Sequence, residues 1–195
     1  TIPGLPSPGN HEHADNAEGV NVITTLWRPQ FALPGNGPEG LEETCYYADV
    51  QGVRFISLNS QAIWFGGELM QKQIDWLHKI LKDNPNKWTC VTFHHPVFSV
   101  KANRDNKNLR EQFKPIFDQY EVDLVLQGHD HAYGRGMKNI AGKKSSSGTM
   151  YVVSMAGSKM YDENRQDWMD KWGGNVQLYQ VITVDGNKLS YNSYT

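Results

Sequence analysis

The sequence is short of cysteine, of long hydrophobic runs and of positive charge. Only Cys45 and Cys90 occur among 195 residues, which excludes a disulfide framework and a cysteine-rich zinc module but leaves one disulfide open. Uncharged stretches such as 89–100 are too short to cross a bilayer, so no membrane span is expected. The formal net charge is −2, and without a basic field we expect no nucleic acid as an obligate partner.

What the sequence does contain is typical of one globular domain. Hydrophobic residues make up 38% and charged residues 21%, a balance that excludes disordered, collagenous and coiled-coil chains. No internal repeat or second domain boundary is visible, so residues 1–195 are predicted to form part of a single domain. The chain opens at Thr1 without Met or a signal-peptide pattern, so we expect a processed protein or a piece of a longer one.

Periodicity predicts a β-hairpin and an amphipathic helix in the first half. Residues 44–48 and 53–58 flank the turn sequence Asp-Val-Gln-Gly, which favours a hairpin. Apolar residues then recur at helical spacing, and the helix is expected to end near residue 84. These apolar residues are Met70, Ile74, Leu77 and Leu81. The Pro- and Gly-rich residues 28–40 predict a long loop.

The second half alternates strands with a helix, which indicates an α/β layer architecture. The predicted strands are 89–93, 122–126, 149–155 and a terminal hairpin of 178–184 and 188–194. The helical stripe consists of Leu109, Phe113, Ile116 and Tyr120. Pro115 inside this stripe predicts a kink or a late start of the helix. Residues 143–148 predict a flexible loop.

Histidines gather where two of these strands end. His94 and His95 follow the strand at 89–93, and His129 and His131 follow the next strand. Carboxyl ends of parallel strands meet at one edge of an open sheet, where α/β proteins bind their ligands. The two strands are therefore predicted to bring imidazoles to the same edge.

The chemistry of these residues favours a metal. Neutral imidazole is a common ligand of zinc and iron, and Asn10 adds a neutral oxygen. Residues i and i+2 of an extended chain point the same way, so His129 and His131 can face one centre. His94 and His95 are adjacent and should diverge, so at most one of them is expected to be a ligand.

Each pattern also has an ordinary interpretation. Gly9-Asn10 alone is usually a turn, and single pairs of histidines also arise by chance in an ordinary α/β domain. Together, at three turn or strand termini, they favour a metal site over that alternative. His78 lies on the predicted helix and is expected at the surface, and His13 is expected in a loop near the site.

Three segments in this order resemble the last three of five motifs of the calcineurin-like metallophosphoesterases. They are Gly9-Asn10-His11-Glu12, Val91-Thr92-Phe93-His94 and Gly128-His129-Asp130-His131. The purple acid phosphatase branch is the most similar, because Gly128 to Arg135 reads Gly-His-Asp-His-Ala-Tyr-Gly-Arg. The resemblance runs through nearly the whole chain and includes Gln73-x-x-Trp76-Leu77.

The resemblance implies an α/β fold of four αββα layers, a β-sandwich flanked by helices with two metal ions between the sheets. These ions would be Fe, Zn or Mn. Asn10, His94 and His129 would bind one ion, and His131 would bind the other. The implied activity is hydrolysis of phosphate esters by a metal-activated hydroxide.

The same resemblance implies roles for two further histidines. His11 would contact the phosphate and assist the leaving group. His95 would lie just outside the metal ligands or face the substrate. The substrate would be a phosphate ester, and the location would be extracellular or periplasmic.

The sequence departs from the family pattern in two places. The first two motifs supply a bridging Asp, a second carboxylate and a tyrosine before Gly-Asn-His, and residues 1–9 contain no Asp, Glu or Tyr. Residues 1–195 are therefore expected to be the C-terminal portion of a single catalytic domain, incomplete at its N-terminal side. In addition, Gly134 stands where the purple branch often has Glu.

These departures lead to expectations for the chain by itself. It should hold no metal or one at most, lack phosphatase activity and risk self-association through an open sheet edge. The intact parent is expected to be an exported phosphoesterase, and the alternative is a non-catalytic ligand- or metal-binding module of the same fold. Aromatic residues at 27–31, 64–65 and 168–172 would either line a substrate cleft or pack in the protein.

Overall fold

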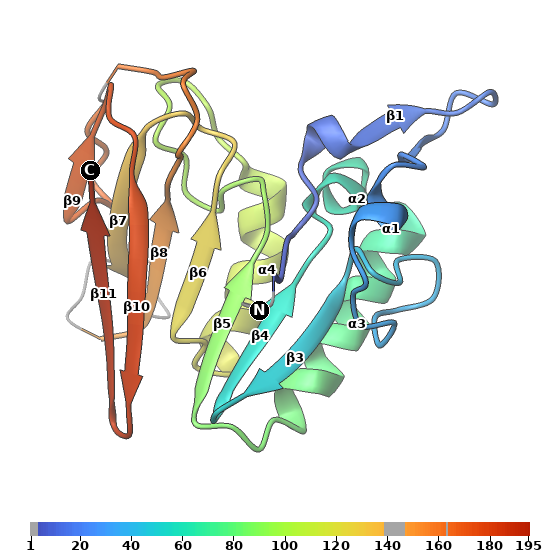
Figure 1. The fold of residues 1–195 in the computed structure, drawn as a ribbon, viewed down its shortest axis with the longest axis horizontal. Helices are drawn as coiled ribbons and strands as arrows, with labels where there is room; N and C mark the ends of the chain where they lie inside the picture. The colour runs from blue at the N-terminus through green and yellow to red at the C-terminus, as the bar shows by residue number, and fades with distance from the viewer. Residues whose placement is uncertain (1–3, 139–146, 163) are drawn as a thin grey trace.

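A seven-stranded mixed sheet forms the centre of the molecule (Figure 1). The structure is a computed structural model that describes residues 4–138, 147–162 and 164–195. In spatial order the strands are β3 (Tyr46–Val50), β4 (Val53–Ser57), β5 (Trp88–Thr92), β6 (Leu124–Gln127), β8 (Thr149–Val153), β7 (Tyr133–Lys138) and β9 (Lys171–Gly173). Strands β4, β5, β6 and β8 are parallel, and the other three pair antiparallel with their neighbours. The carboxyl ends of β5 and β6 therefore lie side by side.

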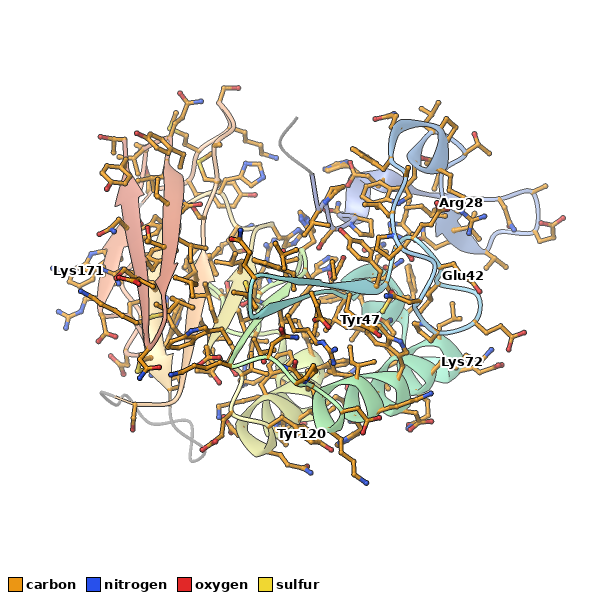
Figure 2. All side chains as sticks on the ribbon, turned by 60° about the horizontal axis from the view of Figure 1, so that its bottom comes forward. Arg28, Glu42, Tyr47, Lys72, Tyr120 and Lys171 are labelled. Carbon is orange, nitrogen blue, oxygen red and sulfur yellow. The ribbon has the colours of Figure 1, made fainter. Side chains whose placement is uncertain are left out.

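Helices cover one face of this sheet. The main ones are α2 (Ser60–Phe65), α3 (Gly67–Lys82) and α4 (Lys107–Gln119). Leu77 of α3, Phe113 of α4 and Val91 of β5 are fully buried in the core between them. Figure 2 shows side chains filling this layer, with Lys72 on the outer side of α3. None of the described helices is long and apolar enough to cross a membrane.

A terminal hairpin covers the opposite face of the sheet. Its strands are β10 (Tyr179–Asp185) and β11 (Lys188–Tyr194). Exposure alternates along β10, so Ile182 and Val184 join a second core with Leu124. The remaining short elements are η1 (Asn10–Glu12), β1 (His13–Asp15), β2 (Asn21–Ile23) and α1 (Trp27–Gln30). Helices, large sheet and two-stranded sheet form successive layers, which confirms the α/β fold class.

The predicted hairpins, strands and long helices occur at their expected places, but the loop predicted at 28–40 is wrong at its start. Helix α1 occupies residues 27–30, because Trp27 is buried and its indole N–H donates to the carbonyl of Glu43 at 3.0 Å. This contact gives the segment a tertiary anchor that its Pro and Gly content does not reveal.

The late start predicted for the second helix is also wrong. Helix α4 runs from residue 107 through Pro115 to residue 119. Proline removes the donor for the carbonyl of Glu111, but both residues are exposed, so water can satisfy that carbonyl. Of the loop predicted at 143–148, residues 143–146 lie outside the described part of the chain.

The two cysteines are free and buried on opposite faces of the sheet. Cys45 belongs to the helix-side core and Cys90 to the hairpin-side core. Burial raises the pKa of both thiols, that of Cys90 to about 12. The disulfide that the sequence left open therefore does not form.

Candidate metal centre

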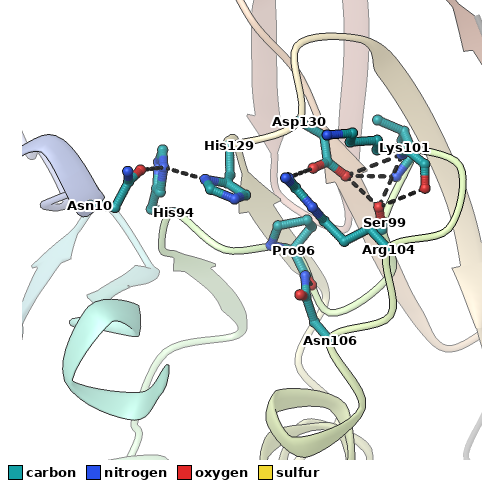
Figure 3. Close-up of polar contacts among 10 residues, drawn as sticks. Asn10, His94, Pro96, Ser99, Lys101, Arg104, Asn106, His129 and Asp130 are labelled. Atoms are coloured by element: carbon teal, nitrogen blue, oxygen red, sulfur yellow. Dashed lines mark hydrogen bonds and ion pairs between the residues drawn. The ribbon is translucent and has the colours of Figure 1, made fainter. Parts of the chain in front are cut away.

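Three side chains from separate segments meet at the carboxyl edge of β5 and β6 (Figure 3). His94 follows β5, His129 follows β6, and Asn10 begins η1. Nε2 of His94 lies 2.7 Å from Oδ1 of Asn10 and 3.0 Å from Nδ1 of His129. Nitrogens that share a zinc ion lie within roughly 4 Å of each other. His94 therefore lies within ligand-sharing distance of both Asn10 and His129, and the three residues are here called the Asn10–His94–His129 cluster.

The cluster holds more lone pairs than protons. Burial lowers the pKa of His94 to about 4, and burial also lowers the pKa of His129. Both imidazoles are therefore neutral at pH 7. If the proton on Nε2 of His94 is donated to Oδ1 of Asn10, no proton is left between Nε2 of His94 and the lone pair on Nδ1 of His129. If Nδ1 of His129 donates to Nε2 of His94 instead, the lone pairs of Nε2 and of Oδ1 of Asn10 face each other. A cation bound between these atoms would relieve either conflict.

The backbone of the Gly-His-Asp-His motif bends after β6. His129 has a φ of 66°, in the left-handed region, a conformation that costs on the order of 1–3 kcal/mol in a residue other than glycine. Because the chain is bent here rather than extended, the i, i+2 expectation is wrong. His131 donates from Nδ1 to the carbonyl of Lys159 at 2.8 Å, and its ring stacks on Tyr161 with centroids 5.0 Å apart. The pKa of His94 is lowered by burial first and then by the neighbouring His129, His11 and His131.

His94 and His95 do not point to opposite sides, as adjacent residues of an extended strand would, because both rings lie beside that of His129. The Ser60 hydroxyl, at the start of α2, lies 2.9 Å from Nδ1 of His95 and accepts the backbone N–H of His95 at 3.0 Å. The centroid of the His95 ring lies 5.1 Å from that of His94 and 4.5 Å from that of His129. Burial lowers the pKa of His95 to about 3. His95 is therefore a neutral imidazole directly behind the cluster, held by a helix that the sequence did not predict.

A second network, missed at the sequence level, holds the turn at Gly9-Asn10. His13 donates from Nδ1 to the carbonyl of Gly9 at 2.9 Å, and its Nε2 accepts from the side-chain amide of Asn59 at 3.2 Å. Gln73, fully buried in α3, makes two hydrogen bonds of 3.0 and 3.2 Å to the backbone of Asn59. His13 is thus the first residue of β1 and a positioning residue, not the loop residue expected. In the sequence, the polar Gln73 next to the apolar stripe of this helix was the only sign that a polar network is buried here.

Asp130 was likewise missed, although it lies inside the histidine motif. Its side chain is completely buried and accepts hydrogen bonds from the Ser99 hydroxyl at 2.6 Å and the Val100 N–H at 2.9 Å. It also forms an ion pair with Arg104. Figure 3 shows this network beside the cluster. The network anchors the bend that presents His129.

Two other histidines lie outside these networks. His11 is exposed on η1, next to Asn10, and its charge contributes to the lowered pKa of His94. His78, expected at the surface, is half-buried, with Nδ1 3.2 Å from the hydroxyl of Tyr120 at the end of α4. The packing of α3 against α4, which sequence periodicity does not specify, explains that difference.

The cluster fits part of a metal site. An amide oxygen and two neutral imidazole nitrogens suit zinc, iron or manganese. Within residues 4–138, 147–162 and 164–195, no group of three or more His, Cys, Asp and Glu side chains is placed to hold an ion. Asn10, His94 and His129 can therefore supply up to three ligands, and the remaining ligands would come from outside the cluster.

The imidazoles and the amide lie together at the carboxyl edge of a parallel sheet. The protein is therefore of the α/β class, with a histidine-rich site at the carboxyl ends of its strands. Comparison with known proteins identifies the family. The model of the calcineurin-like phosphoesterase family matches residues 2–133. The chain belongs to this family, and the resemblance found in its motifs is confirmed.

The relatives include purple acid phosphatases. Human acid phosphatase type 7 is 28% identical over 155 residues, which cover 69% of this chain and 33% of the relative. Purple acid phosphatase 23 of Arabidopsis thaliana is 28% identical over 199 residues, which cover 99% of this chain and 39% of the relative. The chain thus spans about a third of the length of these curated relatives.

A solved structure supports the fold. The purple acid phosphatase from yellow lupin (Lupinus luteus) seeds matches with a TM-score of 0.69 and 19% identity, over 95% of this chain and 37% of that chain. The predicted metallophosphoesterase fold is confirmed. Gly134, where the purple branch often has Glu, has a packing reason: a Cβ there would lie 2.5 Å from Cγ1 of Val100 and 3.1 Å from Cε of Met169.

Proposed function

We propose that the full-length protein hydrolyses phosphate esters at a metal centre to which this chain contributes the Asn10–His94–His129 cluster. The observation that carries the proposal is the approach of Oδ1 of Asn10 and Nδ1 of His129 to Nε2 of His94, at 2.7 and 3.0 Å, at the carboxyl edge of β5 and β6. Membership of the calcineurin-like phosphoesterase family supports it. Because the chain spans only part of its relatives' length, the activity is proposed for the whole protein.

The chain's residues have distinct proposed roles. Asn10, His94 and His129 would bind one Fe, Zn or Mn ion, and His131 would bind a second. A pair of such cations polarises a phosphoryl oxygen and lowers the pKa of water. The low pKa of His94 supports its role, because a neutral imidazole keeps its lone pair for a cation at any pH well above 4.

Two histidines would act on the substrate side. His11 is exposed beside Asn10, so its imidazole can donate a proton to a phosphate oxygen and assist the leaving group. His95 is buried and neutral, and its hydrogen bonds to Ser60 fix its ring against the cluster. It would shape the substrate side of the centre without binding metal.

The 195-residue chain alone is proposed to bind one ion at most and to show no turnover. Three cluster ligands can hold one cation weakly, whereas His131 alone cannot hold a second against water. Without a bridging carboxylate, nothing fixes two cations about 3.5–4 Å apart. Self-association of this chain through an open strand edge, and an extracellular or periplasmic location of the parent, are part of the same proposal.

The alternative is a non-catalytic binding module. The incomplete ligand set of the described residues favours this alternative for the chain alone. The two functions differ in one observable of the full-length protein. A binding module takes up metal without hydrolysing any phosphomonoester.

The test compares three histidine variants of the full-length protein by metal content and phosphomonoesterase activity. His94→Ala should lose metal and lower kcat/KM at least about a hundredfold. His95→Ala should retain more metal than His94→Ala, and His78→Ala, a half-buried histidine on α3, should match the parent protein. Full activity in His94→Ala would refute the proposal. A greater loss of metal in His95→Ala than in His94→Ala would show that His95, not His94, is the metal ligand.

A further inference from the structure

A hollow lies beside His95, outside the Asn10–His94–His129 cluster. It has a volume of about 190 Å³ and is lined by Ser60, Ile63, Trp64, His95 and residues 105–109. We call it the Trp64 pocket. His95 belongs to both regions, because its ring lies 4.5 Å from that of His129 by centroid distance and also lines the pocket. A group bound at the cluster would therefore be one imidazole away from this pocket.

The Trp64 pocket has one planar aromatic wall, and its remaining lining is partly apolar and partly polar. The Trp64 ring stacks on His95, with centroids 5.4 Å apart and an angle of 24° between planes. Trp64 is nevertheless 55% exposed, so a large part of the indole remains open to a ligand. Ile63 and Leu109, both buried, supply the apolar part of the lining. Such a surface favours a flat ring, because aromatic groups stack on one another.

The charges around the pocket are already balanced. Asp105 pairs with Arg110, and Lys107 lies 3.6 Å from Glu111. The pocket therefore presents no excess of positive charge that would select a second phosphate. An uncharged ring suits it better than an anion.

Asn106 is one of the polar residues that line the pocket. Asn106 is 3% exposed, and its amide nitrogen donates to the carbonyl of Pro96 at 2.6 Å. Its side chain does not cap α4, and no hydrogen bond to its Oδ1 occurs within the described residues.

We propose that the Trp64 pocket binds the alcohol part of the phosphoester and selects a planar aromatic group. This inference rests on the proposed phosphoesterase function and names the substrate class for it. The volume is sufficient, since a cavity of about 150 Å³ can hold a benzene ring. The stacking contact exists before and during the reaction, so it should lower KM more than it raises kcat.

The test measures kcat/KM of the full-length protein for an aryl phosphate (2-naphthyl phosphate) and an alkyl phosphate (glycerol 1-phosphate). Trp64→Ala should lower kcat/KM about tenfold for the aryl ester, mainly through KM, and less than twofold for the alkyl ester. Trp64→Phe should recover most of the loss. Phe65→Ala is the matched control, because Phe65 is the neighbouring aromatic residue of α2, is 63% exposed and lines a different cavity.

The results separate this inference from the proposed function. Equal losses for both esters, or no loss for either, would overturn the pocket assignment while leaving the phosphoesterase function intact. If the parent protein hydrolyses neither ester, the proposed function fails. The pocket is then tested by ligand-detected NMR titration with 2-naphthol and cyclohexanol. Preferential binding of 2-naphthol, weakened about tenfold by Trp64→Ala, supports the pocket, and equal binding of the two alcohols overturns it.

Discussion

Gly9→Ala should weaken metal binding by displacing His94. A Cβ at Gly9 would lie 3.0 Å from Nδ1 and 3.1 Å from Cε1 of His94, and 2.9 Å from Oε2 of Glu12. The Glu12 carboxylate can swing away, but the His94 ring is fixed by its contacts with Asn10 and His129. Optimal packing distances begin near 3.5 Å, so the ring must move by about half an ångström.

The expected magnitude follows from the cost of overpacking. Inserting a methyl group into a packed site costs about 1–3 kcal/mol, and each 1.4 kcal/mol is tenfold in Kd. We expect the Kd for zinc of the full-length protein to rise about tenfold, as measured by competition with a chromophoric chelator. Gly128→Ala is the control, because its Cβ would lie at an ordinary 3.7 Å from Nδ1 of His94. Equal zinc affinities of the two variants would refute the reasoning.

Three further outcomes are expected. In chelator-treated protein, the free energy of unfolding should fall by roughly 3 kcal/mol between pH 6.5 and pH 4 because of His94. The pKa of His94 is about 4 in the fold and 6.5 in the unfolded chain, so the unfolded state binds more protons in that window. Urea titrations in which stability rises on acidification would contradict this expectation. Asp130→Ala should lower the free energy of unfolding in urea by about 3–5 kcal/mol, because it removes one partner of a buried ion pair and leaves Arg104 unpaired. Asp105→Ala, which breaks an exposed ion pair, should lower it by less than about 1 kcal/mol. Similar losses in the two variants would show that burial is not the cause. Gly134→Ala should lower the melting temperature, since its Cβ would collide with Val100. An unchanged melting temperature would contradict this, because it would mean that strand β7 moves to make room for the Cβ at no cost in stability.

The sequence predicted what depends on local pattern. Helical spacing located α3, and apolar runs located β5 and β6. The parallel pairing of those two strands then brings His94 and His129 to one edge, as their positions after the strands predicted. The order of three short motifs indicated the calcineurin-like phosphoesterase family, whose model matches residues 2–133.

The sequence did not reveal what depends on contacts between distant segments. The bend at His129 is fixed by Asp130, whose partners Ser99 and Arg104 lie some 30 positions earlier and are invisible to a local pattern. His13 looked like an ordinary loop residue because its partner Asn59 is far away in the chain. The tertiary partner, rather than the residue type, determines each of these roles.

The most direct test of the central claim is a crystal structure of the full-length protein grown with manganese or zinc, with anomalous data collected for the metal. The account predicts an anomalous peak bonded at once to Oδ1 of Asn10, Nε2 of His94 and Nδ1 of His129, at about 2.0–2.2 Å for zinc. An ion bound elsewhere, with Nε2 of His94 still 2.7 Å from Oδ1 of Asn10 and 3.0 Å from Nδ1 of His129 as here, would contradict it.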